Sequence, residues 1–261
     1  MKILVLNDYC CVGNCALKVN ISVLTQNGHE VFGVPTKIFS SNMSYKDYIS
    51  FDLPNFEEVT KKVFEIKDVY AIYIGFIDNR EDFKFIKEIL QNFKGKVILD
   101  PILGDNGVKY SGTKVEQIEF YREFLKYTEV VTPNLTEAIL LTDYDKNFSK
   151  IKREDVEEIA KKLKKMGSKQ VLIKSFEENN KLNTFYLSEK TSKWFEKDKI
   201  EVKISGTGDA FSSLVTNELL KDESLEKSID KIQDLLYENI KNQEKFEGLN
   251  EIKLENFKIG L

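Results

Sequence analysis

The sequence predicts a layered α/β domain, in which a mostly parallel sheet is covered by helices on both faces. Short apolar strands alternate with amphipathic helices along the 261-residue chain, which is typical of parallel sheets with two covered faces. Polar residues follow the strands directly, where α/β proteins bind ligands. The chain is 41% hydrophobic and contains no internal repeat or proline-rich linker. We therefore expect a single domain over residues 1–261.

The expected elements follow from apolar runs, helical periodicity and stop signals, such as Asn27-Gly28 after the first helix. The expected parallel strands are residues 2–7, 30–35, 69–75, 96–100, 129–132 and 170–174, followed by an antiparallel pair at 182–187 and 191–195. The expected helices are residues 16–26, 55–66, 80–92, 119–126, 133–142, 153–166, 207–220 and 225–241. This alternation favours right-handed crossovers within one sheet.

The charge balance argues against nucleic acid and membrane surfaces as partners. The chain has 39 basic and 43 acidic residues and a net charge of −4, whereas such binders usually carry a basic excess. No apolar run approaches the roughly 20 residues that span a bilayer, and the apolar run at residues 3–6 is too short for a signal peptide. We expect a cytoplasmic protein.

Three cysteines, Cys10, Cys11 and Cys15, lie close together near the first strand. An odd number of cysteines in a cytoplasmic protein does not indicate a disulfide framework. The chain has a single histidine, His29, and it is distant in sequence, so a fourth ligand for a metal is not evident. The pattern favours structural or pocket-lining thiols over a metal site.

The first chemical motif, DPILGDNG, runs over residues 100–107, where a strand ends on Asp100. Asp100 and Asp105, together with two glycines, could hold a hydrated Mg²⁺ and the phosphates of a nucleotide, because Mg²⁺ keeps several waters and needs only one or two carboxylates. A solvated loop with turn-forming Asp and Asn explains the same residues equally well.

The second motif, TPNLTE, runs over residues 132–137. Asn134 and Glu137 share one face of a first helical turn. Locally the pattern favours a capping box after a proline. The functional alternative makes Glu137 a holder of metal-bound water.

The third motif, GTGDAF, begins a helix at Gly206. Glycines allow a phosphate to approach the free backbone N–H groups at the positive end of a helix dipole. Asp209 would then lie beside an anion hole and could accept a proton from an attacking hydroxyl. The motif has no Walker lysine, which excludes a P-loop, and a capped turn remains the simpler local interpretation.

Taken in order, DPILGDNG, TPNLTEA and GTGDAF resemble the ribokinase superfamily of small-molecule kinases, and more narrowly its pyridoxal/pyridoxamine kinase branch. The runs LNDYCCVGN and VPTKIFSSNMSY, the pair Gly75-Phe76 and Tyr110 also fit that branch. The similarity covers nearly the full chain. It implies a ribokinase-like three-layer α/β/α sandwich with a central, mostly parallel sheet.

The resemblance implies an ATP-dependent kinase that phosphorylates the 5′-hydroxymethyl group of pyridoxal, pyridoxamine or pyridoxine. Asp209 would be the catalytic base, and the backbone amides of Gly206, Thr207 and Gly208 would form the anion hole. Asp100, Asp105 and Glu137 would organise Mg²⁺, its waters and a monovalent cation such as K⁺. The ATP site would consist of these three acids with Thr132, Asn134, Lys174, Ser175 and Thr207. Residues 105–113 would form a flap over the phosphates, and the protein would be a homodimer.

The acceptor side departs from the family pattern. The resemblance gives substrate contacts to Asp8, Ser41, Asn42, Met43, Phe76 and Asp209. Relatives often have Ser-x-His-Thr where this chain has Ser40-Ser41-Asn42-Met43. This change motivates the alternative of a hydroxymethylpyrimidine or sugar kinase. A third alternative, a non-catalytic vitamer-binding protein, would be indicated by loss of Asp209 or the glycines, and all of these are present.

Overall fold

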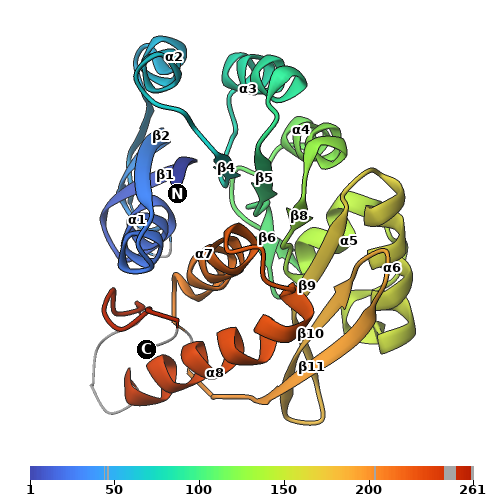
Figure 1. The fold of residues 1–261 in the computed structure, drawn as a ribbon. Helices are drawn as coiled ribbons and strands as arrows, with labels where there is room; N and C mark the ends of the chain where they lie inside the picture. The colour runs from blue at the N-terminus through green and yellow to red at the C-terminus, as the bar shows by residue number, and fades with distance from the viewer. Residues whose placement is uncertain (44, 46, 203, 244–250, 260–261) are drawn as a thin grey trace. The chain divides into compact units, whose positions relative to one another are not determined.

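The structure, a computed structural model, describes residues 1–43, 45, 47–202, 204–243 and 251–259. The described residues belong to two compact units (Figure 1). Unit 1 comprises residues 1–76 and 200–261, and unit 2 comprises residues 77–199. Unit 1 is thus built from the two ends of the chain.

The strands of unit 1 are mainly parallel. They are β1 (Lys2–Val12), β2 (Glu30–Ser41), β3 (Ser50–Asp52) and β4 (Ala71–Ile74). Their order is β4-β1-β2-β3, in which β1 pairs in parallel with β2 and β4 while β3 is antiparallel to β2. β1 is central to this part of the sheet, and its first half is apolar and buried.

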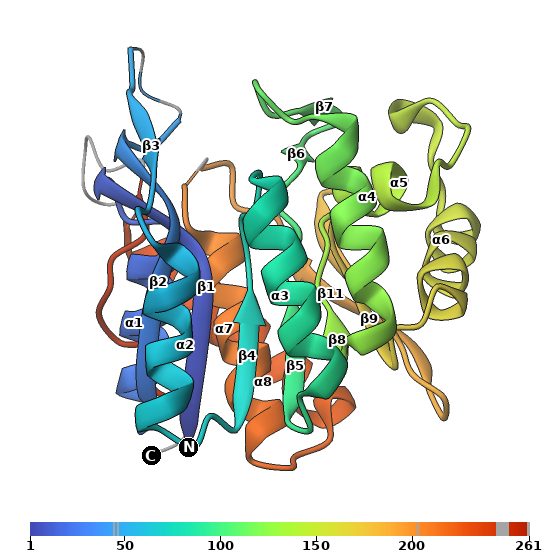
Figure 2. The ribbon, with the colours of Figure 1, turned by 90° about the horizontal axis from the view of Figure 1, so that it is seen from above.

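Unit 1 contains four helices: α1 (Ala16–Gln26), α2 (Phe56–Ile66), α7 (Thr207–Leu220) and α8 (Leu225–Gln243). Figures 1 and 2 show α1 and α2 on opposite faces of β1 and β2, which gives this unit three layers. α7 packs against both α1 and α8. Every residue of α7 from Ala210 to Leu220 is buried, so this helix is enclosed on all sides.

The strands of unit 2 begin parallel and end antiparallel. They are β5 (Lys96–Leu99), β8 (Val130–Val131), β9 (Gln170–Glu178), β10 (Lys181–Leu187) and β11 (Ser192–Asp198). Their order is β11-β10-β9-β8-β5; β5, β8 and β9 are parallel, and β9, β10 and β11 are antiparallel. A separate hairpin joins β6 (Gly104–Asp105) to β7 (Val108–Lys109).

The helices of unit 2 are α3 (Arg80–Asn92), α4 (Val115–Phe124), α5 (Leu135–Thr142) and α6 (Arg153–Lys165), with short 3₁₀ turns η1 (Leu125–Tyr127) and η2 (Phe148–Lys150). α3 and α4 lie side by side in both views, over β5 and β8 (Figures 1 and 2). α6 packs on β9 and β10.

The predicted helices and parallel strands are confirmed, and the antiparallel pair near the end of unit 2 is too. The main difference is the length of β1 and β2, which continue beyond the expected ends at residues 7 and 35. The polar pair Asn7-Asp8 interrupts the apolar run, yet pairing resumes from Tyr9 after a β-bulge. β3 and the β6–β7 hairpin are too short to give a sequence pattern. The helix expected at residues 119–126 begins earlier, at Val115, and ends in a 3₁₀ turn.

Among the helices of the described residues, none combines the length and the apolar character needed to cross a bilayer.

Two glycines with left-handed backbones provide a test of this packing. A Cβ on Gly167 (φ +124°) would lie 2.5 Å from Lys126 Cα, whereas a Cβ on Gly28 (φ +83°) would meet nothing within 4 Å. Gly28→Ala should therefore cost only the backbone strain, about 1–2 kcal/mol. Gly167→Ala adds a backbone clash and should cost roughly 2–5 kcal/mol. Urea unfolding of both variants measures the difference, and equal costs would contradict the close approach of residues 126 and 167.

Candidate active site

Gly206, the residue before α7, is required by both conformation and space. Its φ is +86°, and a Cβ there would lie 2.4 Å from the carbonyl oxygen of Asn14 and 2.8 Å from Ile252 Cγ2. A side chain would therefore separate the start of α7 from the loop before α1. Thr207 and Gly208 form the first turn of α7, whose N–H groups create a region of positive potential suited to an anion.

The carboxylate of Asp209 lies in the same first turn and is held by α1. Its Oδ2 accepts a hydrogen bond of 2.9 Å from the backbone N–H of Ala16, the first residue of α1. Ala16 has a φ of +50°, an unfavourable left-handed conformation for a residue with a Cβ. The residue with this strained backbone is the one whose N–H binds the Asp209 carboxylate, so local strain and a charge-assisted hydrogen bond occur at the same position.

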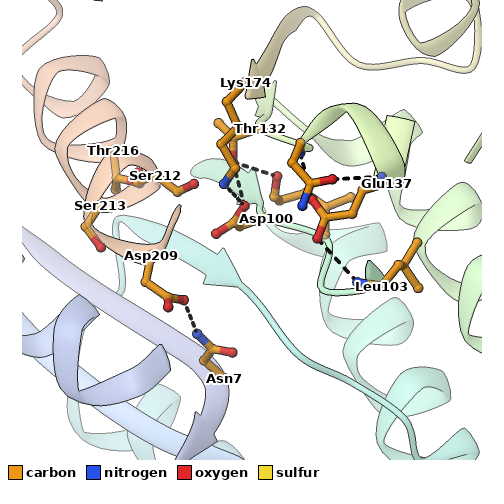
Figure 3. A network of polar contacts seen from close by, with 12 residues as sticks. Asn7, Asp100, Leu103, Thr132, Glu137, Lys174, Asp209, Ser212, Ser213 and Thr216 are labelled. Atoms are coloured by element: carbon orange, nitrogen blue, oxygen red, sulfur yellow. Dashed lines mark hydrogen bonds and ion pairs between the residues drawn. The ribbon is translucent and has the colours of Figure 1, made fainter. Parts of the chain in front are cut away.

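The other oxygen of Asp209 faces Asn7, which sequence reasoning did not include among the site residues. Asn7 Nδ2 lies 3.5 Å from Asp209 Oδ1 (Figure 3). Asn7 and Asp209 are 202 residues apart in the chain, so no local pattern indicates their contact. The available signal is that the polar pair Asn7-Asp8 follows the buried apolar run of residues 3–6 in β1.

Two predicted acceptor-side residues, Asp8 and Phe76, share Asn7 as a partner. Asn7 Oδ1 accepts hydrogen bonds from the backbone N–H groups of Phe76 (2.8 Å) and Asp8 (3.0 Å). The carbonyl of Phe76 accepts from Thr36 Oγ1, and its ring meets Phe39 edge to face. The structure therefore brings Asp8, Phe76 and Asp209 together around Asn7.

Ser41, Asn42 and Met43 lie together at and just beyond the end of β2, and all three are half-buried. The backbone N–H of Asn42 donates to the carbonyl of Val12 at 2.9 Å. The Asn42 Cβ would be only 3.0 Å from a Cβ on Gly13, so Asn42 packs on the loop that leads to α1. Asn42 thus borders the loop that leads to Ala16, the residue whose N–H holds Asp209.

Three free thiols lie beside this loop. Cys10 is buried and its Sγ lies 3.5 Å from Asp8 Oδ2, while Cys11 is exposed. The hydrogen bond to Cys10, burial and the nearby charges of Asp209 and Asp8 all raise the pKa of Cys15. A thiol with a raised pKa is a poor nucleophile, which agrees with a structural role for Cys15.

In unit 2, Asp100 follows β5 and is 1% exposed. Its Oδ1 forms an ion pair of 2.7 Å with Lys174 Nζ and accepts a hydrogen bond of 3.1 Å from Thr132 Oγ1 (Figure 3). A buried carboxylate requires such partners, because an unpaired charge away from water is costly. Three residues predicted for the nucleotide site are therefore in direct contact.

Lys174 and Ser175 lie at a β-bulge in β9. These two residues oppose the single residue Thr184 of β10, and Ser175 has a φ of +64°. Bulges change the direction of side chains and are frequent beside active sites. Here the bulge occurs where β9 supplies the lysine that neutralises Asp100.

Asn134 and Glu137 form the expected capping box at the start of α5. Asn134 Oδ1 accepts from the Glu137 backbone N–H at 3.0 Å, and Glu137 Oε2 accepts from the Asn134 backbone N–H at 2.7 Å. The same side chains reach the DPILGDNG loop, since Asn134 Nδ2 donates to the carbonyl of Gly104 and Glu137 Oε1 accepts from the Leu103 backbone N–H. The local capping interpretation is confirmed, and the cap also fixes the loop after Asp100.

The segment predicted as a flap contains the β6–β7 hairpin. Residues 106–110 are exposed and Asp105 is half-buried. The backbone N–H of Gly107 donates to Thr136 Oγ1 at 2.8 Å, which attaches the hairpin to α5.

The acids of unit 2 differ in their surroundings, which bear on how they could hold a cation. Burial raises the pKa of Glu137 well above its usual value, with Asp100 acting in the same direction and Lys174 opposing it. In the described part of the chain, no group of three or more His, Cys, Asp or Glu side chains is arranged to hold a metal ion. Asp100, Asp105 and Glu137 thus form no direct chelating set. A cation bound nearby through waters would favour the charged form of Glu137.

Comparison with known proteins shows the family of this chain. A family model described as phosphomethylpyrimidine kinase matches residues 17–253. The hydroxymethylpyrimidine/phosphomethylpyrimidine kinase of Aquifex aeolicus is 30% identical over 230 residues, which cover 85% of this chain and 80% of that protein.

Solved structures match over nearly the whole chain. A Bacteroides thetaiotaomicron protein assigned to the phosphomethylpyrimidine kinases has a TM-score of 0.91 at 23% identity. The aligned residues cover 100% of this chain and 94% of the chain of that protein. Pyridoxal kinase from Leishmania donovani, in complex with ADP and pyridoxamine, has a TM-score of 0.84 at 20% identity. The aligned residues cover 98% of this chain and 92% of the chain of that enzyme. The predicted ribokinase-like α/β fold with a mostly parallel sheet is confirmed.

The fold and these matches define a small-molecule kinase. The chain belongs to the phosphomethylpyrimidine kinase family, whose fold it shares with pyridoxal kinases.

The raised pKa of Glu137 predicts a dependence of stability on pH. Because the folded protein holds this proton more tightly than the unfolded chain does, the free energy of unfolding should fall as the pH rises from the usual glutamate value of 4.5 through the folded pKa. Glu137→Gln should remove this part of the slope, as measured by urea unfolding between pH 5 and pH 8.

The matched control is Glu154→Gln, which changes an exposed acid in the first turn of α6. It should leave the slope as in the wild type. A wild-type slope in Glu137→Gln would contradict the assignment of a buried, protonatable Glu137.

Proposed function

We propose that this protein is an ATP-dependent kinase that phosphorylates the 5′-hydroxymethyl group of a vitamin B6 vitamer, namely pyridoxal, pyridoxamine or pyridoxine. The observation that carries the proposal is the start of α7, where Asp209 follows a glycine turn and its Oδ2 accepts from Ala16 N–H. A fixed carboxylate in the first turn of a helix, beside the N–H groups of that turn, suits a general base next to a phosphoryl group.

In the proposed reaction, Asp209 removes the proton of the acceptor hydroxyl as its oxygen attacks the γ-phosphorus of ATP. The new O–P bond forms while the bond between the γ-phosphorus and the bridging oxygen breaks, so ADP leaves with that oxygen. The N–H groups of Gly206, Thr207 and Gly208 stabilise the charge that spreads over the transferring group. Asp8, Phe76, Ser41, Asn42 and Met43 bind the acceptor.

We assign the nucleotide to the polar cluster of unit 2, because Asp100, Thr132 and Lys174 form a fixed network and solved relatives contain ADP. Asn134 and Ser175 complete the ATP-binding residues. Asp100, Asp105 and Glu137 would hold Mg²⁺ through its waters, and when bound this ion neutralises phosphate charge. The residues 105–113 would cover the phosphates and keep water from the reaction.

The vitamer is the first candidate acceptor because pyridoxal is present in one crystal form of the Bacteroides thetaiotaomicron protein, which is 24% identical to this chain, and pyridoxamine in the Leishmania donovani enzyme. The second candidate is a hydroxymethylpyrimidine. It is favoured by the 30% identity with the Aquifex aeolicus kinase and by Asn42 and Met43, which differ from the Ser-x-His-Thr pattern.

The role of Asp209 is tested by Asp209→Asn. The variant retains an oxygen for the Ala16 N–H but loses the basic carboxylate, so kcat should fall by about 10²–10⁴-fold. Vitamer binding, measured by calorimetry, should persist. Asp230→Asn, which changes an exposed acid on α8, is the control and should keep the wild-type rate. Near-normal turnover in Asp209→Asn would contradict the proposal.

The acceptor is tested by ATP consumption with pyridoxal, pyridoxamine, pyridoxine, hydroxymethylpyrimidine and a sugar. We expect turnover with at least one vitamer at the highest kcat/KM. Turnover with hydroxymethylpyrimidine alone would establish the second candidate instead. Vitamer binding without ATP consumption would identify a non-catalytic binding protein.

A further inference from the structure

Asn7 has its amide orientation fixed by the backbone. It is 0% exposed, and its Oδ1 accepts from both Phe76 N–H and Asp8 N–H. Because two donors converge on one end of the side chain, that end must be the oxygen. The Nδ2 group is therefore directed away from both of them.

The Nδ2 group has two hydrogens and two acceptors. One acceptor is Asn20 Oδ1 at 2.8 Å, and the other is Asp209 Oδ1 at 3.5 Å. Asn20 is itself fully buried and donates to Ser213 Oγ at 2.9 Å. Hydrogen bonds thus connect Asn7 of β1 to Asn20 of α1, and Asn20 to Ser213 of α7. Asp209 belongs to α7 as well, so these bonds hold Asn7 beside Asp209.

Gly75 shows that space is reserved for the Asn7 amide. A Cβ at position 75 would lie 2.2 Å from Asn7 Oδ1 and 2.7 Å from its Nδ2. Any other residue would displace this side chain. Gly75 therefore leaves the space that the Asn7 amide occupies, and the neighbouring Phe76 N–H binds the oxygen of that amide.

We propose that Asn7 is a positioning residue for phosphoryl transfer, which holds Oδ1 of Asp209 in place, ionised, to receive the proton of the acceptor hydroxyl. The inference rests on the proposed function, in which Asp209 is the base. Asn7 is completely buried, so it acts through Asp209 rather than on the acceptor. An N–H donor favours the charged form of a carboxylate.

The two oxygens of Asp209 have different roles in this account. Oδ2 is held at 2.9 Å by Ala16 N–H, whereas Oδ1 has the longer contact of 3.5 Å with Asn7. In this account Oδ1, which has the longer of these two contacts, receives the proton. Asn7 limits rotation of the carboxylate while leaving that oxygen able to react.

Other titratable groups lie near Asp209. The charges of Asp209 and Asp8 both raise the pKa of Cys15, which is also hydrogen-bonded to Cys10 of β1. Glu251 of the C-terminal segment faces the Asn14 backbone N–H in the same loop. These groups remain unchanged in the variants below.

The test is Asn7→Asp in the full chain, with kcat, KM and the pH dependence of kcat measured for the best acceptor. One oxygen of the new side chain still accepts from Phe76 and Asp8, while the other faces Asp209 without a hydrogen. We expect kcat to fall by about 10–100-fold, the acidic limb of the pH profile to move up by about one unit or more, and KM to stay within about threefold.

The matched control is Asn217→Asp, which changes a fully buried asparagine further along α7 that contacts His29. It introduces a buried carboxylate away from Asp209 and should lower the unfolding temperature without moving the acidic limb. If Asn7→Asp does not fold, Asn7→Ser removes the same N–H and should shift the limb in the same direction by less.

Wild-type kcat and pH profile in Asn7→Asp, with Asp209→Asn inactive, would overturn the role of Asn7 and leave the proposed function intact. Equal shifts in Asn7→Asp and Asn217→Asp would also overturn it, because they indicate a general effect of buried charge. Full activity of Asp209→Asn would instead remove the base on which the inference rests.

Discussion

The contact between the Ala16 N–H and the Asp209 carboxylate is the constraint on which the rest of unit 1 depends. It requires the loop before α1 to approach the start of α7 closely. Gly206 permits this approach, because any Cβ there would lie 2.4 Å from the Asn14 carbonyl oxygen. Ala16 adopts a left-handed backbone at the same point. The starts of α1 and α7 therefore constrain each other's backbone conformation. The Asp209 carboxylate is held by a backbone N–H group rather than by a long, flexible side chain.

A second constraint, the pairing of buried charge, organises unit 2. Lys174 neutralises Asp100, and the β-bulge in β9 occurs at the position of this lysine. Glu137 instead accepts hydrogen bonds from the backbone N–H groups of Asn134 and Leu103. Its raised pKa follows from that environment. One acid of unit 2 is thus ion-paired, while burial favours the neutral form of the other.

Sequence patterns predicted the helices well, because their ends carry local signals such as Asn27-Gly28 after α1. The bounds of α1, α3 and α7 agree with the prediction to the residue. The three motifs identified Asp100, Asp209 and the capping box, since each lies directly after a strand or before a helix. The sequence could not reveal the Lys174–Asp100 pair or the role of Asn7, because those contacts join residues far apart in the chain. The homodimer and the monovalent cation stay predictions of the resemblance, and the cytoplasmic location stays a prediction from the apolar runs of the sequence.

The central claim is that Asp209 acts on the hydroxymethyl group of a vitamer. A crystal structure of the full chain with pyridoxal and a non-hydrolysable ATP analogue tests it most directly. The account predicts the hydroxymethyl oxygen within about 2.6–3.2 Å of an Asp209 carboxylate oxygen, the reach of a general base. A vitamer bound with that group directed away from Asp209, towards solvent or another side chain, would contradict the account.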